Sequence, residues 1–252
     1  MIKFFRKIRQ KSLADNKVSK YLIYAFGEII LVVIGILIAL QINTANHNRI
    51  NSNQELKIIK ALKTGLETDR KDILFNMESI ELSMFSANKV IFALDNNLPY
   101  KDSIADYIGL TMFPVVFVNS TSAFETLKSK GIDMISNTAL RDEIIGVYDS
   151  GYKFFEKSEQ IVLDENERGL KEIFPTRFEA SYVYDLKRAN YQPRLVPLNF
   201  EALKNDQEFK YYLKSYKNRL NILFYFQYKN TLLKKVNSLI SSLDIEINRL
   251  ES

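Results

Sequence analysis

A continuous apolar stretch near the N-terminus constrains this chain more than any other feature. Between Tyr21 and Ile42, fourteen of 22 residues are Leu, Ile, Val or Phe, and the only charged residue is Glu28. A helix of this length, at about 1.5 Å per residue, just crosses a hydrocarbon core of about 30 Å. Each apolar residue favours insertion by roughly 0.3–0.6 kcal/mol, which together outweigh the roughly 2.5–3.5 kcal/mol cost of a central acid. The stretch therefore predicts a membrane-spanning helix over residues 21–42.

The charges around this stretch predict its orientation. Residues 1–20 carry seven basic residues and one acid, a net charge of +6. By the positive-inside rule such a flank stays in the cytoplasm, so we expect residues 43–252 in the periplasm of a bacterial inner membrane. Residues 41–252 balance 28 basic against 28 acidic residues. A nucleic-acid partner would need a basic face on the folded domain, and a neutral domain gives no support for one. The expected partner of the span and its basic flank is the lipid bilayer.

The basic flank fits two interpretations. Its apolar residues fall at helical spacing on one side and its basic residues on the other, as in a helix that lies in the headgroup layer. The alternative is a disordered basic tail that only sets the topology. In the first interpretation each cation adds about 1 kcal/mol on anionic lipid. The residues expected to contact headgroups are Lys3, Arg6, Lys7, Arg9 and Lys11.

A cleaved signal peptide is a competing interpretation of the same segment. A basic start followed by the uncharged run Ile29–Leu40 resembles one. However, no small-x-small cleavage site follows, and the apolar stretch extends back to Tyr21, which is longer than the core of a signal peptide. We therefore expect an uncleaved anchor.

One face of the predicted span combines a carboxyl group with small residues. Glu28, Val32, Gly35 and Ala39 lie at intervals of four, three and four residues, on one helix face. Gly35 and Ala39 form a small-x-x-x-small pair, which lets helix backbones approach in lipid, and a carboxyl group in a span rarely faces acyl chains. We predict a helix–helix interface here. In the alternatives Glu28 couples protons or ions to a partner, or simply reaches water at the cytoplasmic boundary, and the small residues are ordinary span composition.

Residues 43–252 carry the pattern of a helical domain. The chain has eight Gly, five Pro and no Cys, so a domain in an oxidising compartment depends on its apolar core alone. From Gln54 to Asn96 the apolar residues form a sustained heptad, and the span is expected to run straight into this helix. The repeating residues are Ile59, Leu66, Ile73, Ile80, Ala87 and Leu94.

A second long helix is expected over residues 207–249. Asn205 or Asp206 suits its N-cap, with Glu208 completing a capping box, and its apolar row shifts after Leu223. Antiparallel packing of the two long helices would bury both apolar stripes. The predicted fold class is therefore all-α, with one transmembrane helix that continues into an elongated antiparallel helical bundle.

The segment between the long helices predicts shorter ones. Ser122 with Glu125 suits a capping box, Gly131 a helix C′ position, and Asn137 the next N-cap. The helix after Asn137 is expected to reach residue 151, and another follows over 152–173. Residues 175–197 contain three prolines and are expected to be irregular. Only residues 115–118 resemble a strand, and so short an apolar run is ambiguous.

The residue types of most enzyme chemistry are scarce. The single histidine, His47, lies just past the span, and the chain has no zinc pattern, G-x-S-x-G elbow, P-loop or G-x-G-x-x-G. We predict no enzyme, no cofactor and no metal site. One acidic cluster is interpreted as a solvated helix face rather than as paired catalytic acids. It comprises Glu156, Glu159, Asp164, Glu165 and Glu167.

The second long helix also carries an aromatic run. Much of it is expected in the core, and because it spreads around the helix, a second interpretation places a portion in a partner or ligand groove. The run comprises Tyr211, Tyr212, Tyr216, Phe224, Tyr225, Phe226 and Tyr228.

Two segments carry a recognisable pattern: the opening MIKFFRKIRQ with SKYLIYAFGEIILVVIGILIALQIN after it, and AFETLKSKGIDMISNTALRDEI at 123–144. They resemble a Bacteroidota-type family of single-pass membrane proteins with a domain of unknown function. The span of that family is often followed by Asn-Trp-Asn. Here Asn43 is followed by Thr44, so no role of that Trp is carried over. The resemblance implies the topology and brings no reaction, cofactor or partner.

These patterns predict a non-enzymatic inner-membrane protein. Its periplasmic domain is expected to act as an oligomeric scaffold, either as a homo-oligomer or as an adaptor for another envelope membrane protein. The alternative is a ligand-sensing helical bundle. Such a bundle would signal through a partner protein, because residues 1–20 are too few for a signalling domain.

Overall fold

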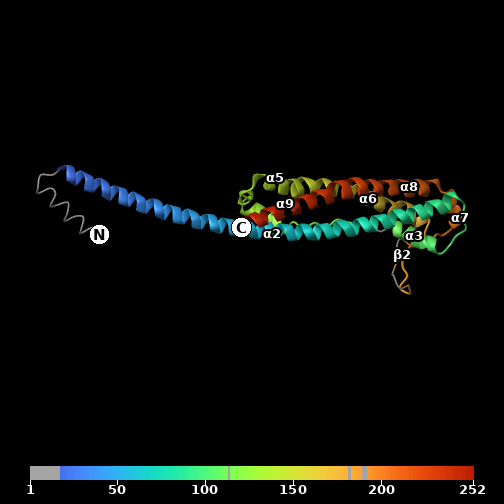
Figure 1. Cartoon of the computed structure of the whole chain (residues 1–252). Coiled ribbons are helices and arrows are strands. Elements are labelled where there is room, and N and C mark those ends of the chain that lie inside the picture. Colours follow the sequence, from blue (N-terminus) through green and yellow to red (C-terminus); the bar gives the residue numbers. More distant parts are fainter. Residues whose placement is uncertain (1–17, 113, 181–182, 189–191) are drawn as a thin grey trace. The chain divides into compact units, whose positions relative to one another are not determined.

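The computed structural model describes residues 18–112, 114–180, 183–188 and 192–252 (Figure 1). The structure is 82% helical with 3% strand, which confirms the all-α class. Contacts divide the chain into two compact units, Met1–Gln54 and Glu55–Ser252. The second unit holds the helical domain.

One helix, α2, runs unbroken from Val18 to Asp95, a length of 78 residues. It contains the apolar stretch of the first unit and the heptad of the second. No Pro or Gly interrupts residues 36–64, so nothing in this stretch breaks the backbone hydrogen bonds. The prediction that the apolar helix continues directly into the next helix is confirmed.

A second helical run packs against the C-terminal part of α2. It consists of α5 (Thr138–Ile145), η2 (Gly146–Gly151), α6 (Tyr152–Arg168) and η3 (Gly169–Ile173), and η2 and η3 are π-helical. Gly151 and Tyr152 keep right-handed helical backbone angles. The sequence predicted two helices meeting here, whereas the structure has one continuous run. A π-turn explains the difference, because it shifts the apolar face without ending the helix.

The third run is also continuous and contains α8 (Gln207–Ile222), η5 (Leu223–Leu232) and α9 (Leu233–Glu251). The π-helix η5 begins at Leu223, where the apolar row of the sequence shifts. Its wider turn moves the row around the helix and so keeps both halves facing the core. The predicted second long helix is confirmed.

The third run lies antiparallel to α2. Lys60 near the start of the domain pairs with Glu251 at 2.5 Å, and Asp95 at the end of α2 pairs with Lys214 at 2.8 Å. The predicted helical hairpin is therefore confirmed for residues 55–252. The heptad faces the interior, and all six of its members are buried: Ile59, Leu66, Ile73, Ile80, Ala87 and Leu94.

Of the predicted helix ends, the N-caps at Asn137 and Asp206 and the glycine at 131 are confirmed, whereas the two capping boxes are not. Asn137 and Asp206 cap α5 and α8 with their side chains, and Gly131, at φ 104°, ends α4 (Ser122–Lys130). The capping box at Ser122 is wrong, because Ser122 is already inside the helix and its N-cap, Thr121, makes no side-chain cap bond. Glu208 does not complete the other box. Its carboxylate instead pairs with Arg177 at 2.5 Å.

Short elements connect the three runs. Residues 183–184 pair antiparallel with residues 193–194, with Val183 opposite Arg194, inside the segment predicted to be irregular. Residues 115–118 do not form a strand, because their backbone groups bond to side chains of helices. The remaining elements are α3 (Ser103–Thr111), η1 (Ile132–Met134), η4 (Phe174–Thr176), β1 (Val183–Tyr184), β2 (Pro193–Arg194) and α7 (Phe200–Asn205).

Candidate functional site

The first candidate site is the small-residue face of the apolar part of α2. This helix is long and apolar enough to cross a membrane. Val32, Gly35 and Ala39 are solvent-exposed in the single chain, and a Cβ added at Gly35 would meet no atom within 4 Å. A shallow hollow beside Glu28 is lined by Ala25, Ile29 and Val33 as well as Val32. The face is therefore open to a second helix, which is what the predicted interface requires.

The predicted headgroup contacts cannot be placed in the same way. Lys3, Arg6, Lys7, Arg9 and Lys11 lie outside the described residues. His47, on α2, is exposed to solvent. Among the described residues, no group of three or more His, Cys, Asp or Glu side chains is arranged to hold a metal ion.

The second candidate site is a cluster of buried carboxylates inside the domain. Asp69 is 0% exposed and Glu159 is 4% exposed. The interpretation of the acidic cluster as a solvated face is therefore wrong for Glu159. Its carboxylate faces the interior because it accepts hydrogen bonds from the backbone N of Phe117 at 3.1 Å and from the hydroxyl of Tyr228 at 3.0 Å. Those two donors compensate for the water that the carboxylate loses.

The carboxylates hold an extended segment, residues 114–121, which we call the strap. The N–H of Val118 donates to Asp72 at 3.0 Å, and the N–H of Ser120 donates to Asp69 at 2.7 Å. With the bond from Phe117 to Glu159, three strap N–H groups therefore bond to carboxylates of α2 and α6. Ionised acceptors make stronger hydrogen bonds than neutral carbonyls, so the strap is fixed without joining a sheet.

Tyrosine hydroxyls complete the network. Tyr152 donates to Asp69 at 2.5 Å, and the amide of Asn76 donates to the hydroxyl of Tyr228 at 3.2 Å. Burial raises the pKa of both Asp69 and Glu159, because the interior disfavours the charged form. Burial also raises the pKa of Tyr152 and Tyr228, so both stay protonated donors.

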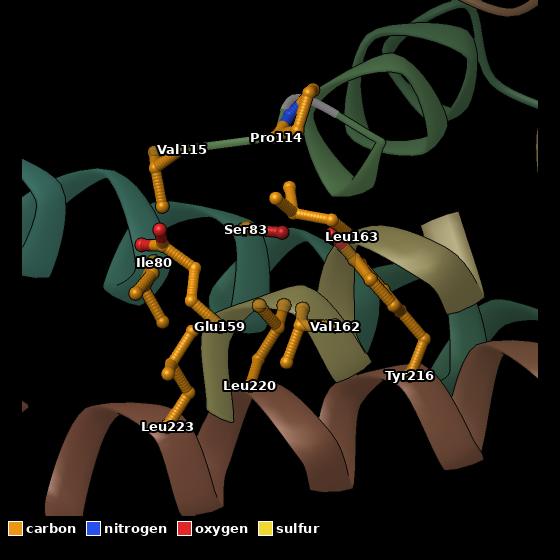
Figure 2. Close-up of a pocket in the computed structure, with 10 residues that line it drawn as sticks. All are labelled: Ile80, Ser83, Pro114, Val115, Glu159, Val162, Leu163, Tyr216, Leu220 and Leu223. Atoms are coloured by element: carbon orange, nitrogen blue, oxygen red, sulfur yellow. The ribbon is translucent and has the colours of Figure 1, made fainter. Parts of the chain in front are cut away.

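Space beside this network is small. A cavity of about 10 Å³ adjoins Glu159 and is lined mainly by apolar side chains, with Ser83 and Tyr216 among the rest. Figure 2 shows the Glu159 carboxylate reaching toward Val115 on the strap. A single water molecule needs about 10–15 Å³. The cavity admits at most one water molecule, and the network holds the strap in place.

One sequence feature indicated this network: polar residues occupy a row of the heptad that otherwise holds apolar core residues. Asp69, Asn76 and Ser83 stand seven residues apart, on the same row as Leu62 and Val90, and all five are buried. Polar residues at core positions of a heptad indicate a specific buried partner. The identity of that partner, the strap, depends on non-local contacts.

The aromatic run divides between the core and the surface. Tyr212, Tyr216, Phe224 and Tyr228 are buried, whereas Tyr211, Tyr225 and Phe226 are exposed. A groove of about 210 Å³ lies between α6 and the α8–η5 run and is lined by Ser158, Ile161, Val162, Arg219, Ile222, Leu223 and Gln227. Part of the surface beside the run is therefore hollowed, as one interpretation required.

The raised pKa of Asp69 predicts an unusual pH dependence. A carboxyl whose folded-state pKa exceeds its ordinary 3.8 binds its proton more tightly in the folded protein. Its stabilising effect is thus lost as the pH rises through the folded-state pKa. We expect the unfolding free energy of the wild type to fall relative to that of Asp69→Asn as the pH rises above 3.8. Urea denaturation across this range measures the difference.

Asp95→Asn is the matched control with the opposite sign. Hydrogen bonds from Lys214 and Lys210 lower the pKa of Asp95, so its contribution is present above 3.8 and is lost as the pH falls through the folded-state pKa. The wild type should therefore lose stability relative to Asp95→Asn on acidification. If the stability difference from the wild type changed with pH in the same direction for both variants, the opposite pKa shifts assigned to Asp69 and Asp95 would be contradicted.

Comparisons of the chain with protein-family models, with curated proteins and with solved structures give no match. The resemblance to the Bacteroidota-type family stays a prediction.

Proposed function

We propose that this chain is a single-pass protein of a bacterial inner membrane, with the basic flank in the cytoplasm and residues 55–252 in the periplasm. The domain acts as a non-enzymatic scaffold that assembles with further copies or with another envelope membrane protein. One observation carries this proposal: α2 joins an apolar span without interruption to a packed helical domain.

Two features support a scaffold over a sensor. The groove between α6 and α8, at about 210 Å³, is smaller than the roughly 300–1,000 Å³ of most ligand sites. A second hollow of about 280 Å³ at Arg177 is also small, and the guanidinium there is already bonded to Asp206 and Glu208. The open face at Gly35 and Ala39 adds a place where a second span packs closely.

The alternative is a ligand-sensing bundle that signals through a partner. Purification of the full chain in mild detergent distinguishes it from the scaffold. A scaffold gives a stable complex of fixed stoichiometry by light scattering and mass spectrometry. A lone monomer whose melting temperature rises with a small molecule would contradict the scaffold and favour the sensor.

Disulfide cross-linking of Val32→Cys, Gly35→Cys and Ala39→Cys, compared with the same change at Leu37, tests the span face. Equal cross-linking at all four positions would contradict an interface there.

A further inference from the structure

The strap, residues 114–121, is held to the domain by few contacts. In the described part of the chain, no backbone–backbone hydrogen bond joins residues 114–120 to another segment. Phe117 is the only buried side chain of the strap, and its ring packs edge-on against Tyr152 and Phe155, with ring centroids 5.3 and 5.5 Å from its own. A segment that buries so little apolar surface opens at a lower free energy than the helices beneath it.

Carboxylates accept most of the polar contacts of the strap. Asp69, Asp72 and Glu159 each accept a strap N–H, at 2.7, 3.0 and 3.1 Å. Asp69 and Glu159 are 0% and 4% exposed. Because the strap backbone supplies part of their cover, lifting it returns both carboxylates to water. Opening of the strap therefore changes the surroundings of two buried acids at once.

Asp69 has no cation beside it. Its hydrogen bonds come from the hydroxyl of Tyr152 on α6 and the N–H of Ser120 on the strap, while Asp72 is a second acid on the same helix. Tyr148 of η2 also lies near, and its buried hydroxyl has no hydrogen-bond partner among the described residues. No described Lys or Arg makes an ion pair with Asp69. Its charge is therefore surrounded by neutral donors and one further acid.

Glu159 has the same kind of surroundings. Tyr228 of η5 and the N–H of Phe117 donate to it, whereas Glu156 on its own helix and Asp72 on α2 are acids. The cavity beside it is lined by no other charged side chain, and no cation within the described ranges pairs with it. The strap thus covers two buried acids whose charges nothing compensates.

Two effects on these acids oppose each other. The N–H and O–H donors favour the ionised carboxylate, whereas the loss of water and the neighbouring acids favour the protonated form. Burial is the larger effect at both positions, and it raises the pKa of Asp69 above the ordinary 3.8 and that of Glu159 above the ordinary 4.5. Each acid therefore binds its proton more tightly beneath the closed strap than in water.

We propose that the strap is a proton-linked latch, which closes more firmly as Asp69 and Glu159 take up protons. An acid of this kind contributes fully to closure below its ordinary pKa, and the contribution is lost as the pH rises through the closed-state pKa. Acid therefore holds the latch shut, and a rise in pH loosens it. The latch is independent of the topology proposed above, because all of its groups lie within residues 55–252.

Hydrogen exchange of the full chain in mild detergent, followed by mass spectrometry, measures the opening. For fragments that cover residues 114–121, the ratio of the measured to the intrinsic exchange rate gives the open fraction at each pH. Between about pH 4 and about pH 8 this ratio should rise in the wild type, by up to about tenfold per pH unit for each carboxyl that ionises. The double variant Asp69→Asn with Glu159→Gln should give a nearly constant ratio. A wild-type ratio that stays constant, or that falls as the pH rises, overturns the latch.

Fragments from the buried heptad separate strap opening from unfolding of the whole domain. Residues 80–94 of α2 should exchange far more slowly than the strap at every pH. Equal open fractions for the two segments would show that the strap opens only when the domain unfolds. That result overturns the latch and leaves the proposed function standing.

Tyr152→Phe tests the mechanism without removing an acid. The Tyr152 hydroxyl donates to Asp69 and lowers the pKa of that carboxyl, so its loss raises the pKa further. The rise in strap exchange should then extend to higher pH than in the wild type, which is the opposite of the effect of Asp69→Asn. Asp95→Asn, which removes a surface carboxyl paired with Lys214, should leave the wild-type profile unchanged. A profile that ignores Tyr152→Phe, or that Asp95→Asn flattens, contradicts the assignment of the latch to these acids.

Discussion

Tyr228→Ala should lower the free energy of unfolding by about 4 kcal/mol, within the roughly 3–5 kcal/mol range for large aromatic truncations. Tyr228 is 0% exposed, and its ring packs edge-on against Phe155 with centroids 4.6 Å apart. Truncation leaves a cavity at this contact. It also removes the hydroxyl that donates to Glu159 at 3.0 Å, so that a buried carboxylate keeps only the N–H of Phe117. Urea denaturation of the full chain in mild detergent, followed by circular dichroism, measures the loss.

Tyr228→Phe separates the two contributions. It retains the ring and removes only the hydroxyl, so the expected loss is about 1–3 kcal/mol for the hydrogen bond to a charged group. The order of stability should be wild type, then Phe, then Ala. Equal losses for the two variants would show that ring packing contributes nothing, which contradicts the core described above.

The second large effect is expected from Gly169→Ala in the π-helix η3. A Cβ built on Gly169 would overlap the hydroxyl and ring of Tyr212, which is itself 0% exposed and held between Phe174 and Tyr216. Because the ring has no free space to move into, overpacking should lower the unfolding free energy by about 1–3 kcal/mol. The thermal unfolding midpoint of the purified chain reports the change.

Gly146→Ala is the matched control in the same helical run. An added Cβ at Gly146 would meet no atom within 4 Å, and its backbone is right-handed helical. Replacing such a glycine by alanine stabilises a helix by roughly 0.5–1 kcal/mol. The two substitutions should therefore shift the midpoint in opposite directions. A gain for Gly169→Ala would contradict the close packing against Tyr212.

Local and periodic signals were enough to predict much of this fold. The heptad from Ile59 to Leu94 depends only on spacing, and the caps at Asn137 and Asp206 depend on side chains within three residues of the bonds they make. Because no Pro or Gly follows the span over residues 36–64, the sequence predicted that α2 continues without a break. These features lie within single segments, where sequence patterns and structure correspond directly.

The features that could not be predicted depend on contacts between distant segments. Glu159 is buried because the strap N–H at residue 117 and the hydroxyl of Tyr228 meet it from two other parts of the chain. Periodicity alone cannot reveal such partners, so an acid on an amphipathic helix was assigned to the solvated side. The continuity from α5 to α6 was missed for a different reason. A π-turn changes the phase of the apolar row, and a phase change resembles a helix end.

We propose above all that the chain spans the membrane once near its start, with the flank inside and the domain outside. Because the wild type has no Cys, single substitutions can be labelled with a membrane-impermeant maleimide in intact spheroplasts. We expect that Ser252→Cys is labelled at once, whereas Lys3→Cys is labelled only after the membrane is permeabilised. Protection of position 252 together with free labelling of position 3, or equal labelling of both before permeabilisation, would contradict it.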